Sequence, residues 1–157
     1  MSLLRFLMLL ALIVWVGGLI FFPVVAGTAF SVLPSAHLAG LVVRRSLILL
    51  HWMGIVSGLV FLASSMLYSR AAHGATQVFS ARHLLVLLML ALTCISQFGI
   101  IPRMDKLRDT LGDVASAAIN SPVRMQFDAL HVWSTRVEGG VLLVGLVVAY
   151  LTARSPA

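Results

Sequence analysis

The chain has 157 residues and a mass of 16.9 kDa; 61% of its residues are hydrophobic and only 10% are charged. Soluble domains carry about 25% charged and about 45–50% apolar residues, so this composition excludes an ordinary soluble domain and indicates a membrane protein. The net charge of +6 does not indicate a nucleic-acid partner, because the basic residues flank apolar runs, where they anchor spans at anionic headgroups. We therefore expect the lipid bilayer, and no nucleic acid, as a partner.

Four apolar segments have the length of about 20 residues that a membrane span requires. The sequence therefore predicts a single all-α domain over residues 1–157, an integral membrane four-helix bundle with an additional amphipathic helix between the third and fourth spans. The predicted spans cover residues 3–30, 46–68, 82–102 and 130–152, and the amphipathic helix covers residues 104–119.

The first segment, from Leu3 to Phe30, is predicted to be a retained span rather than a cleaved secretory signal. Its uncharged run of about 25 residues is longer than the apolar region of a signal peptide, which has about 7–15 residues. Pro23 lies inside this run. Membrane helices tolerate such a proline, and it predicts a bend near Phe22.

The second helix is predicted to begin at Ala36, because Pro34-Ser35 is a helix start signal. Farther along, Gly54 and Gly58 form a GxxxG spacing, which lets a neighbouring helix approach closely. Packing inside the bundle and dimerisation with a second chain are both compatible with this spacing.

Apolar residues recur at three- and four-residue intervals from Met104 to Ala118, with charged residues between them. This pattern predicts an amphipathic helix. It either lies on the membrane surface or extends the third span into the aqueous phase. Asn120-Ser-Pro122 breaks it.

The fourth span contains an ionisable residue. Its uncharged stretch Gly139–Leu151 has 13 residues and a length of about 20 Å, too short for a hydrocarbon core of about 30 Å. Glu138 therefore lies inside the membrane, about 9 Å below the interface. An ionisable group in a span costs at least about 2.5–3.5 kcal/mol, so Glu138 is a candidate functional residue.

His51 and Gln97 are predicted to lie at the same depth as Glu138. Counting helical rise from the arginines that flank the second and third spans places them about 10 Å and about 9 Å deep on the same side. We expect His51 and Glu138 to form a hydrogen bond, with Gln97 and Arg136 satisfying the remaining polar atoms.

Three interpretations of this polar layer are open. The residues lock the helices in register, or they line a proton or solute pathway, or they form a ligand site for haem or a transition metal, since imidazole is a common metal ligand. The candidate cofactor-binding residues are His51, Gln97, His131 and Glu138, with His51 and His131 as metal ligands. His131 alternatively anchors the fourth span beside Trp133 at the membrane interface.

The other histidines are weaker candidates. His37 and His73 lie in predicted connections, and His83 lies at the opposite interface, too far from His51 to share a metal. Cys94 is the only cysteine, which excludes an intramolecular disulfide. No hydrolase, kinase or nucleotide-binding signature is present, so the sequence does not indicate an enzyme.

Charges in the connections predict the orientation. The first and third connections carry more Lys and Arg than the opposite side, which by the positive-inside rule places both termini outside. We expect an integral protein of the bacterial inner membrane. The predicted membrane anchors are Arg44, Arg45, Trp133 and Arg136.

Several stretches resemble the transmembrane protein 205-like family. They are Trp15-Val-Gly-Gly-Leu-Ile-Phe-Phe22, His51, Pro102-Arg-Met104 and Phe127-Asp-Ala-Leu-His-Val-Trp-Ser134. The resemblance covers nearly the whole chain; the family's bacterial members are largely uncharacterised, and its eukaryotic branch is associated with platinum-drug resistance. The family has Asn where this chain has Gln97, and again near Glu138.

The Trp-x-Gly-Gly stretch is also similar to the copper-resistance D membrane domain and to the haem-containing bacterial protoporphyrinogen oxidase. That oxidase has an essential His in its first span, whereas Leu3–Phe30 contains none. The sequence predicts a membrane-embedded binding or accessory protein whose polar site holds haem or a metal ion. The alternatives are a small-solute or proton transporter and a structural subunit of a larger membrane complex, and a homo-oligomer is compatible with each.

Overall fold

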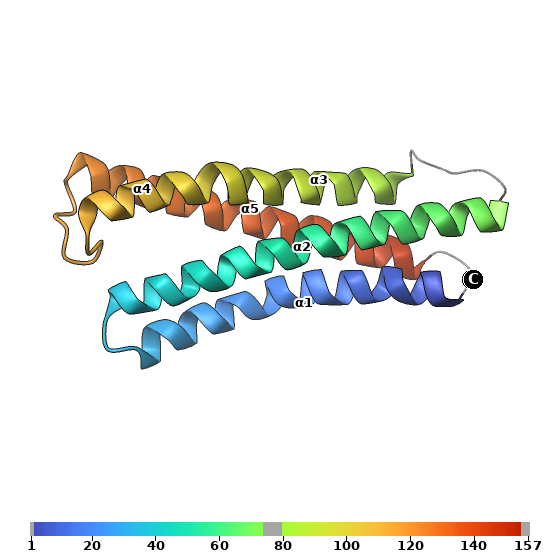
Figure 1. Ribbon diagram of the computed structural model, residues 1–157, viewed down its shortest axis with the longest axis horizontal. Helices are drawn as coiled ribbons and strands as arrows, with labels where there is room; N and C mark the ends of the chain where they lie inside the picture. Colours follow the sequence, from blue (N-terminus) through green and yellow to red (C-terminus); the bar gives the residue numbers. More distant parts are fainter. Residues whose placement is uncertain (1, 74–79, 155–157) are drawn as a thin grey trace.

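The computed structural model describes residues 2–73 and 80–154, and this part of the chain is helical apart from short connections, with no strand. The α-helices are α1 (Ser2–Val32), α2 (Ala36–His73), α3 (Ala81–Ile95), α4 (Ile101–Leu111) and α5 (Pro122–Ala153). A π-helical segment, η1 (Ser96–Ile100), joins α3 to α4 in one continuous rod. Figure 1 shows the helices side by side along one axis, so the predicted all-α bundle is confirmed.

Within the described residues, four helical rods are long and apolar enough to cross a membrane: Ser2–Val32, Ala36–Ala71, Ala81–Leu111 and Pro122–Ala153. The outer surface of the bundle carries many large hydrophobic side chains, such as Phe21, Leu59 and Leu143. Contact of such an apolar surface with water would be unfavourable, whereas lipid hydrocarbon solvates it well. The chain is therefore an integral membrane protein in contact with the lipid bilayer.

Serine side chains cap the starts of α2 and α5. Ser35 Oγ accepts a hydrogen bond from the Leu38 N–H at 3.2 Å, which confirms the predicted start of α2. Ser121 Oγ accepts one from the Arg124 N–H, also at 3.2 Å, and Pro122 occupies the first position of α5. Both arrangements satisfy backbone donors that the first helical turn leaves free.

The predicted amphipathic helix continues the third span rather than forming a separate element. Its predicted end at Ile119 is wrong, because the helix ends at Leu111. Gly112 has a φ of 67°, a left-handed conformation that favours glycine and ends helices. The Ala115 N–H then donates to Asp113 Oδ1 in a turn. The apolar periodicity beyond Gly112 therefore does not form a helix.

Pro102 explains the π-helical segment η1. Proline has no N–H, and in a regular α-helix its ring would clash with the carbonyl four residues earlier. In η1 the Ile101 N–H donates to Ser96 O, five residues back, so the helix widens just before the proline. Such widened turns occur frequently at functional sites, and this one carries Gln97.

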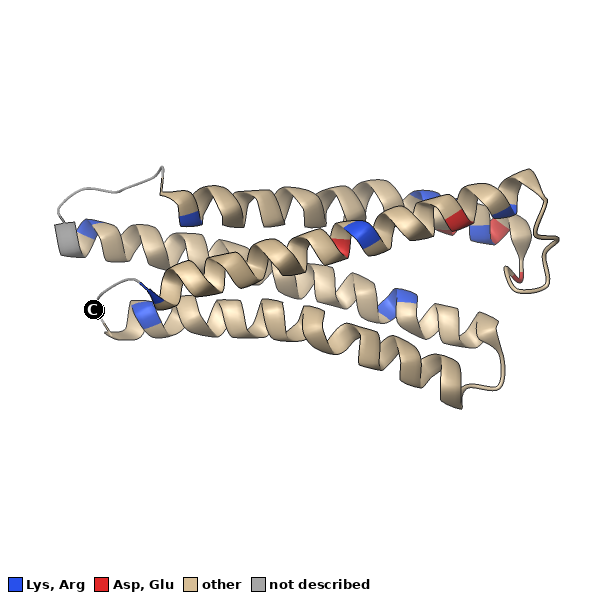
Figure 2. Cartoon of the chain, turned by 180° about the vertical axis from the view of Figure 1, so that it is seen from behind, with Lys and Arg blue, Asp and Glu red and all other residues tan. Residues whose placement is uncertain are grey.

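Helices α1 and α2 pack along each other, whereas α5 contacts α3, α4 and α1. The main core lies between them and includes Trp15, Phe61, Met89, Val141 and Val148. Figures 1 and 2 show that the α1–α2 pair diverges from α4 and α5 toward the end that carries the connections 33–35 and 112–121. This divergence positions the candidate site.

Gly54 and Gly58 of the GxxxG spacing lie against residues of the same chain. A Cβ atom on Gly54 would overlap Trp15 Nε1, and one on Gly58 would lie 2.7 Å from Leu90 Cδ2 and 2.8 Å from Trp15 Cζ3. The small residues thus make room for the Trp15 indole between α1 and α2. This face is occupied inside the monomer and is not open to a second chain.

Candidate functional site

His51 joins three helices in the interior of the bundle. Its side chain is 1% exposed. Its Nε2 atom lies 2.7 Å from Glu138 Oε1 on α5, and its Nδ1 atom lies 2.8 Å from Gln97 Oε1 in η1. The predicted His51–Glu138 hydrogen bond and the participation of Gln97 are confirmed.

The two hydrogen bonds of the His51 ring determine the position of one proton and leave two possible positions for a second. Because Nδ1 faces the Gln97 carbonyl oxygen, it donates to that oxygen. The remaining proton lies between Nε2 and Glu138 Oε1: either an imidazolium donates to a carboxylate, or a carboxylic acid donates to a neutral imidazole. The pair carries no net charge in either state, which reduces the cost of burying it in the membrane.

Glu138 has an oxygen atom without a partner. Its Oε2 atom is buried and has no hydrogen bond, although the side chain as a whole is 13% exposed. Thr93 Oγ1 and Ser96 Oγ, on the rod that carries Gln97, are also buried without partners. Buried polar atoms are normally paired with protein or ordered water, so this level of the bundle has unused capacity for hydrogen bonds.

Arg136 does not satisfy Glu138, so this part of the prediction is wrong. Its guanidinium lies 5.5 Å from the centre of the Trp133 ring, and both side chains are on the outer side of α5. The two residues are three apart, which places them on one helical face. Both lie on the exposed face, as does Arg45, and the anchoring role of these residues stays a prediction.

The described part of the chain supplies no set of ligands for a metal ion. Within residues 2–73 and 80–154, no group of three or more His, Cys, Asp or Glu side chains is placed to hold a metal ion. Both ring nitrogens of His51 are already hydrogen-bonded, and His131, farther along α5, does not complete a set with His51 and Glu138.

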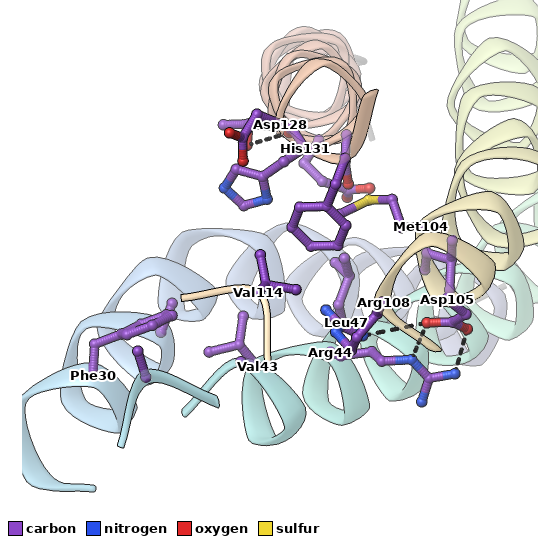
Figure 3. Close-up of a pocket in the computed structure, with 18 of the residues that line it drawn as sticks. Phe30, Val43, Arg44, Leu47, Met104, Asp105, Arg108, Val114, Asp128 and His131 are labelled. Carbon is purple, nitrogen blue, oxygen red and sulfur yellow. Dashed lines mark hydrogen bonds and ion pairs between the residues drawn. The ribbon is translucent and has the colours of Figure 1, made fainter. Parts of the chain in front are cut away.

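A pocket of about 640 Å³ lies between the α1–α2 pair and the α4–α5 pair. It runs from Phe30 and Ala36 at the end of the bundle to Leu19, Glu138 and Leu142 in the interior. Most of its lining is apolar. Figure 3 shows Phe30 and Val43 on one side, with Asp128 and His131 of α5 facing them across the pocket. Glu138 therefore belongs both to the His51 cluster and to the inner end of the pocket.

Ion pairs line the pocket nearer the connections. Arg44 binds both oxygens of Asp105, linking α2 to α4, and Arg108 lies 3.3 Å from the same carboxylate (Figure 3). On α5, Arg124 lies 2.9 Å from Asp128. Figure 2 shows that the acidic residues gather in this half of the bundle.

The sequence interpretation missed the Arg44–Asp105 pair, because it assigned Arg44 to lipid headgroups. The signal was available from helical depth. Arg44 precedes His51 by seven residues and Asp105 follows Gln97 by eight, which places them at nearly the same level on adjacent helices.

The remaining histidines have different surroundings from those expected. His83 is buried, and its Nε2 atom lies 2.8 Å from Ser65 Oγ, rather than at an open interface. His37 lines the pocket mouth, with Nδ1 3.9 Å from Asp113 Oδ1. His73 is the last residue of α2, and most of the predicted polar link after it, including Gly74 and Gln77, lies outside the described residues.

These features define a four-span integral membrane protein with a polar cluster in its interior and a pocket that ends at this cluster. The family model for a domain of unknown function, DUF4149, matches residues 10–112, about two thirds of the chain, and the chain belongs to this family. The match includes His51 and Gln97 but not Glu138. Comparison with curated proteins and with solved structures gave no match. The resemblances to the transmembrane protein 205-like family and to the copper-resistance D domain stay predictions.

Proposed function

We propose that this chain is a membrane-embedded binding protein that takes up a small, largely apolar organic molecule in the pocket between its two helix pairs. The observation that carries this proposal is the pocket itself. Its volume of about 640 Å³ falls in the range of about 300–1,000 Å³ that is usual for ligand sites. Its lining also has the usual composition, with apolar walls and a few polar groups at defined places.

Packing alone does not account for this space. A void between helices forfeits dispersion contacts on its walls, so a bundle selected only for stability would close it. Here the ion pair between Arg44 and Asp105 joins the two sides near the connections, while the interior between Leu19 and Leu142 stays open. An occupant restores the missing contacts.

A neutral aromatic probe tests the proposal. The protein is reconstituted in nanodiscs of a zwitterionic lipid, and binding of naphthalen-2-ylmethanol is measured by equilibrium dialysis against empty nanodiscs. We expect saturable binding with one probe per chain. Ala26→Trp fills the pocket and should abolish binding, whereas Ala91→Trp, on the lipid-facing side of α3, should leave binding unchanged. Binding that does not saturate, or that Ala26→Trp does not change, overturns the proposal.

Transport is a second candidate, favoured by one observation. Buried polar side chains continue along α2 beyond His51, namely Ser57, Ser64 and Ser65, and Ser65 is bonded to His83 near the opposite end. Such a series is typical of proton or solute pathways in membranes. Proteoliposomes containing the protein should then show a flux of protons or of a small solute that Glu138→Gln abolishes. A flux that is unchanged in this variant would contradict the transport function.

The location and assembly of the protein are also proposals. The excess of Lys and Arg in the connections around the pocket mouth supports a bacterial inner-membrane protein with both termini outside and the pocket open to the cytoplasm. A homo-oligomer or a larger complex would use a surface other than Gly54 and Gly58, because Trp15 covers that face.

A further inference from the structure

We infer that the pocket selects an amphipathic cation, with an ammonium-type N–H group at Glu138 and an apolar body between the two helix pairs. This inference rests on the proposed binding function and names the chemical class of the ligand. Three observations on the described residues support it: the charges that line the pocket, the free oxygen of Glu138, and the aromatic lining.

The arginines of the pocket are all engaged by carboxylates. Asp105 binds Arg44 and lies 3.3 Å from Arg108, and Asp128 lies 2.9 Å from Arg124. An anionic ligand would therefore have to displace an existing carboxylate. The carboxylate of Glu138 is different, because it is bonded to His51 and to no arginine. The inner end of the pocket thus has no arginine to attract an anion, and the His51–Glu138 pair there carries no net charge.

Glu138 Oε2 is the acceptor available for the ligand. It is buried and unpaired, while Oε1 is held by His51. An ammonium group supplies both a hydrogen-bond donor and a positive charge, and charge-assisted hydrogen bonds are about twice as strong as neutral ones. A neutral alcohol supplies only the donor, and a carboxylate supplies neither a donor nor a positive charge. We therefore expect Glu138 to favour an ammonium group most, a neutral alcohol less and a carboxylate least.

Aromatic rings line the route from the mouth to Glu138. Phe22 and Phe30 of α1 and Phe127 of α5 belong to the pocket, and the Arg108 guanidinium already lies 5.5 Å from the centre of the Phe127 ring. Ring faces attract cations, most strongly where water is excluded. The apolar and aromatic walls thus accommodate the body of an organic cation without opposing its charge.

Three probes that share one ring system test the inference: naphthalen-2-ylmethylammonium, naphthalen-2-ylmethanol and 2-naphthoate. Each is titrated against the full chain in zwitterionic nanodiscs, with empty nanodiscs subtracted. We expect the ammonium probe to bind about tenfold more tightly than the alcohol, and the naphthoate to bind most weakly. Glu138→Gln should remove the preference for ammonium and leave the affinity for the alcohol within about twofold, because the amide keeps a hydrogen bond to His51.

The outcomes separate the two proposals. Equal or stronger binding of the alcohol, or an ammonium affinity that Glu138→Gln leaves unchanged, overturns the cation inference while the binding function stands. Saturable binding of none of the three probes overturns both. If Glu138→Gln reduces the thermal stability in nanodiscs, Ala26→Trp gives the second comparison. It should abolish binding of the ammonium probe and of the alcohol alike, and a loss confined to one of the two probes would contradict a shared pocket.

Discussion

His51 and Glu138 are 87 positions apart in the sequence, and their side chains meet at 2.7 Å between α2 and α5. The His51 imidazole also contacts Gln97, so it links η1 and α5 to α2 at one level of the membrane. Removal of this one side chain would leave two polar groups unpaired in the interior.

His51→Ala should therefore destabilise the bundle by about 1–3 kcal/mol, the usual cost of leaving buried polar groups without partners. Thermal unfolding in mild detergent, followed by circular dichroism, measures the effect. His37→Ala is the matched control: its side chain is 37% exposed, and we expect a change within about 0.5 kcal/mol. Equal stability of the two variants would contradict a structural role for the His51 cluster.

Gly54→Ala should be destabilising by about 1–3 kcal/mol, because the new Cβ atom overlaps the Trp15 indole in a packed core. Gly17→Ala is the control, since nothing lies within 4 Å of its added Cβ atom, and it should gain about 0.5–1 kcal/mol from the better helix former. The double variant Gly54→Ala/Trp15→Leu should recover part of the loss. Similar melting temperatures for Gly54→Ala and Gly17→Ala would argue against the close approach of α1 and α2.

Reversal of the Arg44–Asp105 pair tests the link between the two sides of the pocket. Arg44→Glu places two carboxylates together and should cost about 1 kcal/mol, since both side chains are partly exposed and such pairs are worth about 0–1 kcal/mol. Adding Asp105→Arg to Arg44→Glu should restore at least half of the loss. Arg45→Glu, on an exposed neighbour, should have little effect. A double variant no more stable than Arg44→Glu alone would show that the pair does not join α2 to α4.

Cysteine labelling tests the proposed orientation. In a Cys94→Ser background, Ala81→Cys at the start of α3 and Ser116→Cys in the connection between α4 and α5 introduce exposed thiols at opposite ends. A membrane-impermeant maleimide applied to intact cells should label Ala81→Cys at once and Ser116→Cys only after permeabilisation. The reverse pattern would place both termini inside.

Depth along a helix was predictable from the sequence, and for that reason the polar layer was found. His51 and Gln97 lie a countable number of residues from a flanking arginine, and Glu138 lies a countable number from Leu151 at the end of its span. Helical rise converts each number to a depth. The direction in which a side chain points around the helix was not predicted equally well. Arg136 was expected at Glu138 but lies over the Trp133 ring.

Helix ends and spaces between helices were harder to predict. The apolar periodicity up to Ala118 outweighed the single Gly112, although the left-handed conformation of that glycine ends the helix. The pocket depends on how far the α1–α2 pair diverges from α4 and α5. That divergence is a property of the whole packing, and no local pattern in the sequence contains it.

Photoaffinity labelling is the most direct test that an organic cation occupies the pocket. A primary alkylamine carrying a diazirine is irradiated with the protein in zwitterionic nanodiscs, and the adducts are located by mass spectrometry. We predict adducts on pocket residues such as Phe22, Leu47 and Leu142, which excess naphthalen-2-ylmethylammonium suppresses and Ala26→Trp prevents. Adducts confined to lipid-facing residues such as Phe21 and Leu143, with no effect of the competitor, would contradict a binding site between the helix pairs.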